Sequence, residues 1–574
     1  MTDKFIKSIT FVKGGDVYYP LPKVTNADDG KVLKVVDGAW SLDEYPKILM
    51  EIKVTTSPTT VEYTEGDSLD LTGLVVTATF DNGSTKDVTS QCIMSPSAGT
   101  VLATTDEVIN ISYTYKGVTR NTAQIIVVES AVPYLSFIGN EDFTLKTYNT
   151  KKNWDGALQY STNASTWNTW GGTTAISSSG GKLYLRGIGN TKITGDGASK
   201  CRFVFTGTSA LKIACKGNIE NLLNYETVSA GGHPTMAEYC YQSMFRDCTA
   251  LTTAPKLPAT TLSRCCYQHM FRGCSSLTTA PKLPATTLDN YCYQYMFYGC
   301  SSLTTAPKLP ATTLDECCYQ YIFYGCSSLT SAPALPATTL AKYCYQYMFR
   351  GCTSLTTAPK LPATTLASGC YAGMFYGCTA LTTAPELPAT TLATQCYHYM
   401  FVSCSSLTTA PKLPATTLAL GCYQYMFYGC SSLTSAPALP ATTLANQCYR
   451  SMFNHCSSLT TPPSVLPATT LIDSCYQCMF EFTAIEAIPK IMATKYATNS
   501  CKGMFDDIKT LNVYSTSGTG HTYGWTAPSS ASTYCSGMFG SDDGESEWAK
   551  LDGSNFPNNG TPTDGKTYYF KTVA

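Results

Sequence analysis

CYQYMFYGCSSLTTAPKLPATTL, residues 292–314, is one of ten closely similar copies of the stretch that decides the fold. The first cysteine of the copy recurs every 26 residues from Cys240 to Cys448, and the tenth copy begins one residue late, at Cys475. Two weaker copies follow beyond residue 500. A fixed period between about 20 and 50 residues is typical of a solenoid, in which each coil packs on its neighbours.

Each copy predicts one coil built from short elements. Cys266, Met270 and Phe271 are spaced near the helical period, so we expect a short helical or 3₁₀ turn that ends at Gly273. Residues 277–283 favour a short strand, which their proline limits. The side chains expected to face inward are Cys266, Met270, Phe271, Cys274, Leu277, Leu283 and Leu288. One coil buries too little apolar surface to fold alone, so the array must fold as a cooperative stack.

The repeat resembles the BspA-like, Treponema-type leucine-rich repeat. In the copy that begins at Cys266, the matching positions are Phe271, Gly273, Cys274, Leu277 and Pro284. Cysteine and methionine stand where that family has isoleucine and alanine, and the unit here is longer. The resemblance implies a curved solenoid with a β face, of a kind used elsewhere mainly for surface adhesion.

Length and charge restrict the class of protein. A chain of 574 residues should contain several domains. The net charge is −1 and only 14% of residues are charged, so nothing points to nucleic acid or to an acidic membrane surface. The apolar runs are too short to span a bilayer. The first ten residues, MTDKFIKSIT, lack the apolar stretch of a secretory signal, so we expect no general secretion signal.

The 27 cysteines suggest disulfides at first sight, but their spacing disfavours them. Cys266 and Cys274 would lie ~12 Å apart on a helix, beyond the ~7 Å that a disulfide spans. Cysteines stacked in one column would point in parallel, which disfavours the disulfide dihedral angle, and the spacing is not that of a zinc site. We therefore expect the repeat cysteines to be buried, reduced thiols that stack in columns from coil to coil. We expect exceptions first at Cys265 and Cys317, each of which directly precedes a repeat cysteine.

The flanking regions divide the chain into further domains. We expect an N-terminal attachment segment at 1–46, an Ig-like domain at 47–130, a β-rich domain that caps the solenoid at 131–232, repeats at 233–500, and degenerate repeats with a C-terminal cap at 501–574. Residues 26–40 resemble N-terminal attachment segments of phage head and tail fibre proteins. An ordinary β-hairpin explains these residues equally well.

The second region predicts a β-sandwich. Val76, Ala78 and Phe80 alternate along one strand, and Ile109, Ile111, Tyr113 and Tyr115 alternate along another. The run from Tyr63 to Phe80 resembles bacterial Ig-like domains, which are usually spacers or weak adhesion units, and a spacer is the favoured interpretation.

The third region contains Trp154, Trp167 and Trp170, close in sequence to Tyr160. Three tryptophans suggest a platform on which a sugar stacks, but a tryptophan cluster is more often core, and we favour core.

No catalytic, metal-binding or cofactor-binding set is recognisable in the sequence. The chain has five histidines, none with a partner set, and no marked pair of carboxylates. We therefore expect no enzyme activity, no cofactor and no metal site.

The variable positions of the repeat carry the candidate ligand-binding face. They stack in columns of tyrosine, arginine and lysine, which suit a surface that binds protein or glycan. Stacking between coils, without any ligand, is the equally weighted alternative. The candidate residues are Tyr295, Tyr321, Tyr347, Tyr399, Tyr425, Tyr298, Tyr324, Arg350, Tyr376, Tyr428, Lys282, Lys308 and Lys360.

These observations predict a mainly β, multi-domain chain with a bacterial Ig-like β-sandwich and a right-handed leucine-rich-repeat solenoid, with a short strand and a short helix in each coil. The favoured function is a structural virion protein of a bacteriophage, a head or tail fibre that adheres to its host. A bacterial cell-surface adhesin is the alternative, and a carbohydrate-active enzyme ranks third. The partners expected are other virion proteins, a host surface protein or glycan, and further copies of the chain in a homo-oligomer, with no nucleic acid and no membrane insertion.

Overall fold

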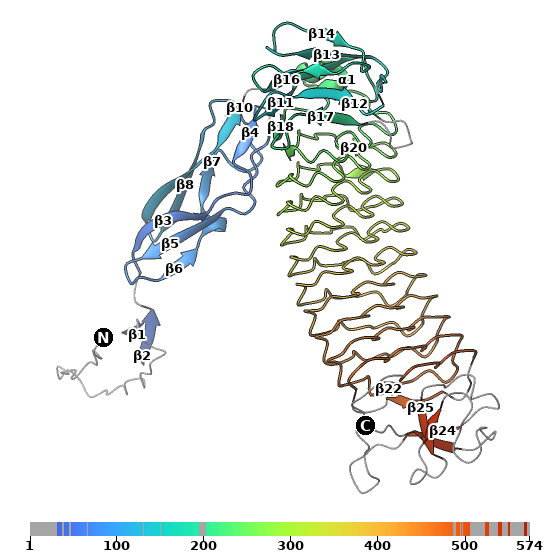
Figure 1. Cartoon of the computed structure of the whole chain (residues 1–574). Coiled ribbons are helices and arrows are strands. Elements are labelled where there is room, and N and C mark those ends of the chain that lie inside the picture. The colour runs from blue at the N-terminus through green and yellow to red at the C-terminus, as the bar shows by residue number, and fades with distance from the viewer. Residues whose placement is uncertain are drawn as a thin grey trace, which may run out of the picture. The chain divides into compact units, whose positions relative to one another are not determined.

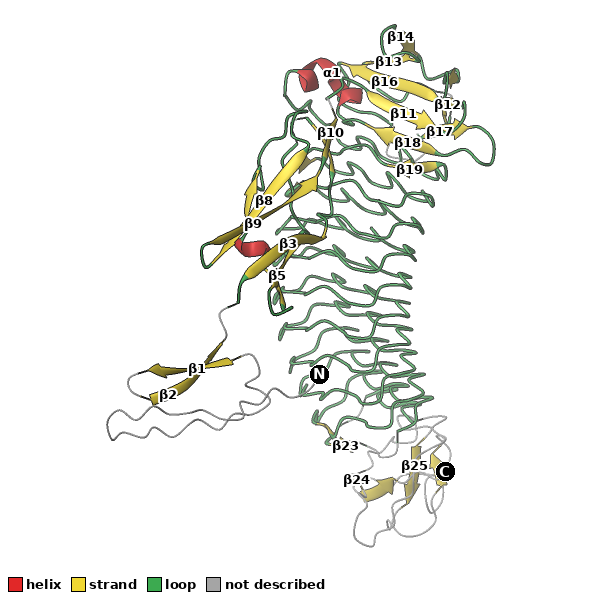
Figure 2. Ribbon diagram, turned by 90° about the vertical axis from the view of Figure 1, so that its left-hand side faces the viewer, coloured by secondary structure: helices red, strands yellow, loops and turns green. Residues whose placement is uncertain are grey.

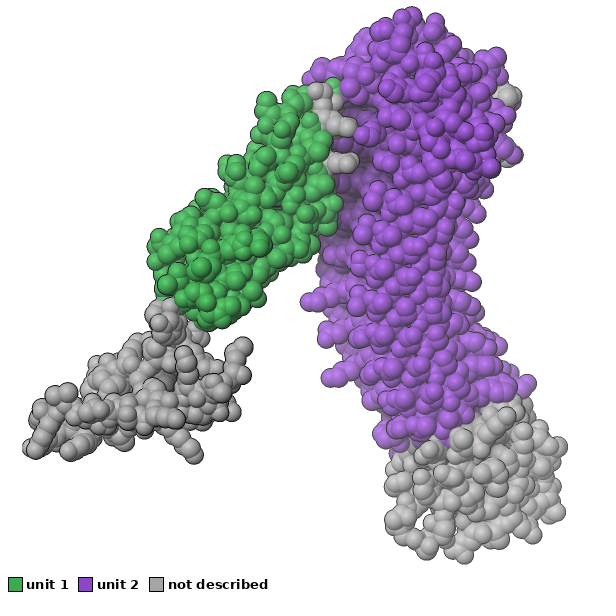
Figure 3. Space-filling view, turned by 60° about the vertical axis from the view of Figure 1, so that its left-hand side comes forward, with its two compact units in different colours: residues 1–131 green, residues 132–574 purple. Residues whose placement is uncertain are grey.

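The computed structural model describes residues 47–65, 67–129, 131–149, 151–194, 202–485, 489–493, 495 and 497–505. It also describes six strands nearer the ends of the chain: β1 (Lys31–Val36), β2 (Ala39–Glu44), β24 (Tyr523–Thr526), β25 (Met538–Ser541), β26 (Ala549–Leu551) and β27 (Thr567–Phe570). The chain forms two compact units, Met1–Ala131 and Val132–Ala574, which Figure 3 colours separately.

The two ends of the chain are described only as strands. β1 pairs antiparallel with β2, with Val36 opposite Ala39, so residues 31–44 contain the expected hairpin. Strands β24, β27, β25 and β26 form one sheet in that order. Residues 26–30 of the phage-like stretch and most of the expected C-terminal cap lie outside the described residues.

Residues 47–129 form a β-sandwich with its own core. One sheet has the strand order β3-β5-β6 and another β7-β8-β9, while β4 pairs in parallel with β10. The expected alternation is confirmed, because Val76, Ala78, Phe80, Ile109, Ile111 and Tyr113 are all buried. The elements are β3 (Leu49–Thr56), β4 (Glu62–Thr64), β5 (Val75–Phe80), β6 (Thr85–Asp87), the 3₁₀ helix η2 (Thr89–Gln91), β7 (Ile93–Ser95), β8 (Val108–Tyr115), β9 (Val118–Ile125) and β10 (Val127–Glu129).

The region that follows packs on the first coil of the solenoid (Figures 1 and 2). It has a six-stranded sheet of order β14-β13-β16-β11-β18-β19 and a three-stranded sheet of order β15-β12-β17. The last strand of the larger sheet, β19, belongs to the first coil, and β18 pairs with it in parallel. The elements are β11 (Leu135–Gly139), β12 (Thr144–Thr147), β13 (Ala157–Ser161), β14 (Asn168–Trp170), β15 (Ile176–Ser177), β16 (Lys182–Ile188), β17 (Phe203–Thr206), β18 (Ile213–Lys216), α1 (Asn221–Ser229) and β19 (Leu251–Thr253).

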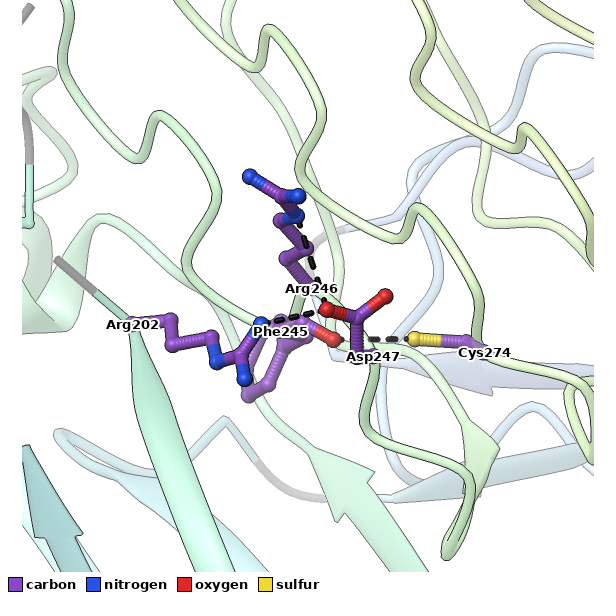
Figure 4. A network of polar contacts seen from close by, with 5 residues as sticks. All are labelled: Arg202, Phe245, Arg246, Asp247 and Cys274. Atoms are coloured by element: carbon purple, nitrogen blue, oxygen red, sulfur yellow. Dashed lines mark hydrogen bonds and ion pairs between the residues drawn. The ribbon is translucent and has the colours of Figure 1, made fainter. Parts of the chain in front are cut away.

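The junction between this region and the first coil contains a polar network (Figure 4). The guanidinium of Arg202 pairs with the carboxylate of Asp247, and Nε of Arg246 lies 3.5 Å from the same oxygen. Asp247 has a φ of +58°, at the position where the next coil has Gly273. The first coil thus places a carboxylate where the following coils favour glycine, and this carboxylate binds the preceding region.

Each coil begins with a run of four-residue turns rather than with the predicted short helix. Met296 N–H donates to Tyr293 O in its own coil (3.1 Å), but Phe297 N–H donates to Ile322 O in the next coil (2.9 Å). Alternate N–H groups from residue 291 to residue 299 bond to the next coil in this way, which an α-helix does not allow. Turns that repeat every four residues also bring the side chains of residues 292, 296 and 300 to one side. The apolar residues of this segment are therefore spaced much as in an α-helix, although the segment is not helical.

In the coil that begins at Cys266, the strand predicted over residues 277–283 is reduced to a single bridge at Thr279, and the two-residue strand lies later, at Thr287–Leu288. Parallel pairs join β20 (Thr261–Leu262) to β21 (Thr287–Leu288) and β22 (Val465–Leu466) to β23 (Lys490–Ile491). Most other coils make single bridges 26 residues apart, such as Thr279 with Thr305. Prolines in this part of the coil lack the N–H that a longer ladder requires.

The core of the solenoid includes an aromatic column that the inward set expected from the sequence omitted. The tyrosine that directly follows each repeat cysteine is at most 1% exposed. Its rings stack from coil to coil, as Tyr293 on Tyr319 at 5.8 Å, beside a phenylalanine column in which Phe297 lies 5.7 Å from Phe323. The clue in the sequence was that this tyrosine does not vary among the ten copies. Its members are Tyr241, Tyr267, Tyr293, Tyr319, Tyr345, Tyr371, Tyr397, Tyr423, Tyr449 and Tyr476.

Candidate binding face of the solenoid

The third residue after each repeat cysteine lies on the outside of a turn with an unusual backbone. Tyr295, Tyr321 and Tyr347 have φ values of +57°, +58° and +53°, and Gly373 has +60° in the same column. Positive φ at the third residue of a four-residue turn is type II geometry, which favours glycine. A non-glycine residue in this conformation costs roughly 1–2 kcal/mol. Tyrosine therefore recurs where the backbone alone would select glycine.

Together with His269 of the preceding coil, Tyr295, Tyr321 and Tyr347 form a stack that we call the first lane. The ring centroids of His269 and Tyr295 are 4.7 Å apart, those of Tyr295 and Tyr321 4.5 Å, and those of Tyr321 and Tyr347 5.2 Å. The rings lie within 18° of parallel. Their faces are therefore covered by neighbouring rings.

A second stack, the second lane, runs beside the first: Arg272, Tyr298, Tyr324, Arg350 and Tyr376. The guanidinium of Arg272 lies 4.8 Å from the ring of Tyr298, and the rings of Tyr298 and Tyr324 are 4.4 Å apart. The guanidinium of Arg350 lies between two rings, 5.3 Å from Tyr324 and 4.2 Å from Tyr376. Cations over aromatic faces at these distances attract the ring electrostatically.

The two lanes touch along their length and form one surface, the tyrosine–arginine platform. Tyr295 lies 5.8 Å from Tyr298, Tyr321 lies 6.0 Å from Tyr324, and the guanidinium of Arg350 lies 5.3 Å from the ring of Tyr347. Six of the predicted site tyrosines and Arg350 thus come together. Arg272 and His269, which the predicted site left out, belong to the same surface.

The electrostatics of the platform are those of a donor surface with positive charge. Among the described residues, neither Arg272 nor Arg350 has a carboxylate or a hydrogen-bond partner for its guanidinium, a planar group with five N–H donors. Burial and the neighbouring Tyr295 raise the pKa of Tyr321 to about 12, so its hydroxyl remains a donor at neutral pH.

The platform ends where the first lane is interrupted by Gly373. A Cβ atom at Gly373 would lie 2.1 Å from Cε1 of Tyr347. The ring of Tyr347 therefore occupies the space that a side chain at position 373 would fill. Tyr376 then contacts Tyr399 edge to face at 6.4 Å, and a smaller cluster continues from there. The cluster contains the remaining predicted tyrosines, Tyr399, Tyr425 and Tyr428, with Tyr399 and Tyr425 5.1 Å apart and Tyr425 and Tyr428 5.8 Å apart.

The predicted lysines form a separate row. Lys282, Lys308 and Lys360 are exposed and lie in the proline-containing part of the coil. None of the ring–ring and cation–ring contacts given above for the platform involves one of these three lysines. The lysine row remains a candidate surface in its own right.

The repeat cysteines lie in the core and hydrogen-bond as thiols. Sγ of Cys300 lies 3.1 Å from Phe271 O in the preceding coil, and Sγ of Cys352 lies 3.1 Å from Phe323 O. Burial raises the pKa of the Cys300 thiol to about 12. The pKa values of Cys265 and Cys317, the expected exceptions, are also raised by burial, to about 11 and about 12. A thiol with so high a pKa is a poor nucleophile and a poor metal ligand at neutral pH.

Three of the described histidines, His233, His269 and His398, differ in their surroundings. Burial lowers the pKa of His269 and of His398 to about 4, so both are neutral at pH 7. Nδ1 of His233 lies 2.8 Å from the carboxylate of Glu220. Within the part of the chain that the structure describes, no three side chains are grouped as ligands for a metal.

The tryptophans of the third region divide between core and surface. Trp154 and Trp170 are 6% and 2% exposed and lie 5.2 Å apart, as expected for core. Trp167 is only partly buried, and the guanidinium of Arg186 lies 4.1 Å from its ring. No platform of three tryptophans is therefore available for a sugar.

The fold and these columns define a repeat protein with an outer face of stacked tyrosines and arginines, and comparisons with known proteins identify its modules. Residues 56–127 match the model of the bacterial Ig-like domain (group 3), and residues 239–382 and 342–482 match the BspA-type leucine-rich repeat region. The chain therefore contains both modules, as the resemblances implied. Together they support a surface adhesion-type protein.

Among solved structures, a leucine-rich repeat protein from Bacteroides ovatus is 15% identical over 52% of this chain and 89% of its own, with a TM-score of 0.21. No curated protein matches the sequence. None of the helices that the structure describes has the length and apolar character needed to cross a membrane.

Proposed function

We propose that this chain is a non-enzymatic adhesion protein whose solenoid binds a partner through the tyrosine–arginine platform. The observation that carries the proposal is the repeated presence of tyrosine at positive φ, where Gly373 shows that glycine is accommodated. Residues held in a costly backbone conformation are typical of functional surfaces. Stacking between coils recovers part of that cost, but the buried tyrosine and phenylalanine columns already stack the coils.

The Ig-like domain serves as a spacer in this proposal, and residues 1–46 serve for attachment. Two settings are consistent with such an arrangement. The resemblance of residues 26–40 to phage fibre segments favours a head or tail fibre of a bacteriophage, bound to other virion proteins and oligomeric like most fibres. The BspA-type repeats favour a bacterial surface adhesin instead. Immunogold labelling of purified phage particles and of intact cells distinguishes the two settings.

A binding assay tests the function in either setting. The full chain, fluorescently labelled, is incubated with a panel of gut bacteria and host epithelial cells, and retention is compared with that of the triple variant Tyr298→Ser, Tyr324→Ser, Tyr376→Ser. We expect at least a tenfold loss of retention. A matched triple variant in the lysine row, Lys282→Gln, Lys308→Gln, Lys360→Gln, should retain most binding. Equal binding by the wild type and the tyrosine variant would remove the platform from the function.

A further inference from the structure

The platform has a chemical character more specific than adhesion. The rings of the first lane stack face to face from coil to coil, within 18° of parallel. In the second lane Tyr298 and Tyr324 stack at 9°, and guanidiniums lie over the rings of Tyr298, Tyr324 and Tyr376. Neutral sugars bind aromatic residues mainly through open ring faces, which these stacks do not offer. The platform residues are half-buried, and the polar groups that they contribute are tyrosine hydroxyls and the N–H groups of two guanidiniums.

The charges of the platform are of one sign. Most residues at positions three, six and seven after the repeat cysteine are half-buried, and between residues 266 and 430 these positions carry Arg272 and Arg350 but no aspartate or glutamate. Both guanidiniums are held by stacking on tyrosines, which leaves their planar N–H edges free to donate to a carboxylate or a sulfate in bidentate fashion. They lie three coils apart, about 14 Å along the axis at ~4.8 Å per coil.

Hydrogen bonds between coils hold the platform in place without a ligand. Backbone N–H groups bond from coil to coil beneath it, and Nε2 of Gln268 donates to Oε1 of Gln294 at 2.5 Å in an amide row beside it. Ordered side chains lose little further entropy on binding, which favours affinity for an extended ligand.

From these features we propose that the platform binds an extended anionic polysaccharide, with a carboxylate or sulfate group at Arg272, another at Arg350, and sugar hydroxyls along the tyrosine hydroxyls between them. The inference rests on the proposed binding function and names its ligand class. A protein partner is disfavoured because the exposed large apolar side chains in the described part of the solenoid, Leu420, Val465, Phe482 and Met492, all lie outside the platform coils.

The test measures retention of the full chain on immobilised heparin (sulfated), polygalacturonate (carboxylated), neutral dextran and poly-glutamate over a salt gradient. We expect retention on one or both acidic polysaccharides, loss of that retention as salt rises, and no retention on dextran. The double variant Arg272→Gln, Arg350→Gln should bind at least tenfold more weakly. Arg350→Lys, which keeps the charge but not the planar fork, should lie between the two.

The charge-matched control is Lys282→Gln, Lys360→Gln, which removes the same charge at the same spacing of three coils and should change retention less than threefold. Circular dichroism of each variant verifies that the solenoid is folded. Equal losses in the arginine and lysine variants, retention only on dextran or on poly-glutamate, or no retention at all would each overturn the proposal. Loss of cell binding in the tyrosine variant, with no retention on acidic polysaccharides, would overturn this inference and leave the adhesion function standing.

Discussion

At the scale of the residue, the same amino acid performs two tasks in one coil. Tyr293 is buried and stacks with its column in the core, whereas Tyr295, two residues later, is held outward at positive φ. The sequence allowed the outer column to be predicted, because those positions vary between copies. Residue type alone did not show which of the two positions is buried, since both carry tyrosine. The discriminating signal was invariance within the repeat, not hydrophobicity.

The positive φ of the outer column predicts an unusual order of stabilities. Tyr321→Gly should be more stable than Tyr321→Ala by about 1 kcal/mol, because alanine retains the cost of the left-handed conformation and glycine does not. At Tyr324, which has no positive φ, the order should reverse. Urea unfolding of the four variants measures both differences. Alanine proving the more stable at position 321 would show that the turn relaxes.

The two buried histidines predict a pH dependence. The pKa of His269 and of His398 is about 4 when folded, below the ordinary value of 6.5, so the unfolded chain binds more protons between those pH values. Their contribution to stability is complete above pH 6.5 and is lost as the pH falls to 4, on the order of 1–3 kcal/mol each after discounting partial exposure.

The repeat itself suggests the control for this pH dependence. In His269→Tyr, His398→Gln, each histidine is replaced by the residue that most other coils carry at the same position. The free energy of unfolding of this variant should fall less than that of the wild type between pH 6.5 and pH 4. Parallel curves would mean that neither histidine is neutral in the folded chain.

At the scale of the element, the turns explain why the coil was only partly predictable. The period of 26 and the inward apolar positions follow from the sequence, but a repeat of four residues and a helical period of 3.6 look alike over nine residues. Hydrogen bonds between coils favour the four-residue turns over an α-helix. They connect residues 25 apart, such as Phe297 and Ile322. Such bonds are invisible to a pattern read along a single coil.

The junction at Asp247 gives a prediction at this scale. Asp247→Gly relieves the positive φ and loses the ion pair with Arg202, so the two effects nearly cancel in global stability. Asp247→Ala keeps the strained φ and loses the pair, and should destabilise by up to about 1 kcal/mol. Hydrogen exchange should show faster exchange in β17 and β18 for both variants than for the wild type. Unchanged exchange would mean that the pairing of β18 with β19 alone holds the junction.

At the scale of the whole molecule, the solenoid behaves as a stack in which each coil contacts only its neighbours. One core continues from the β-rich region through the coils to Phe505, so no coil is independent. Deleting residues 396–421, one full period, should leave the fold intact and lower the thermal midpoint only slightly, because the new neighbours are equivalent. Deleting 396–408, half a period, should abolish cooperative unfolding, since inward and outward positions are exchanged. Equal tolerance of both deletions in thermal unfolding would refute the stacked-coil account.

The claim on which the functional account depends is that the outer platform, and not another face of the solenoid, makes contact with the target. Hydroxyl-radical footprinting of the full chain, free and bound to its target surface, measures this directly, since each tyrosine reports its own accessibility by mass spectrometry. The buried Tyr319 and Tyr345 should stay unmodified throughout and serve as internal controls. The account predicts that binding protects Tyr321, Tyr324 and Tyr376 several-fold while residues outside the platform, such as Tyr148, do not change. Unchanged oxidation of the platform tyrosines in the bound state would contradict it.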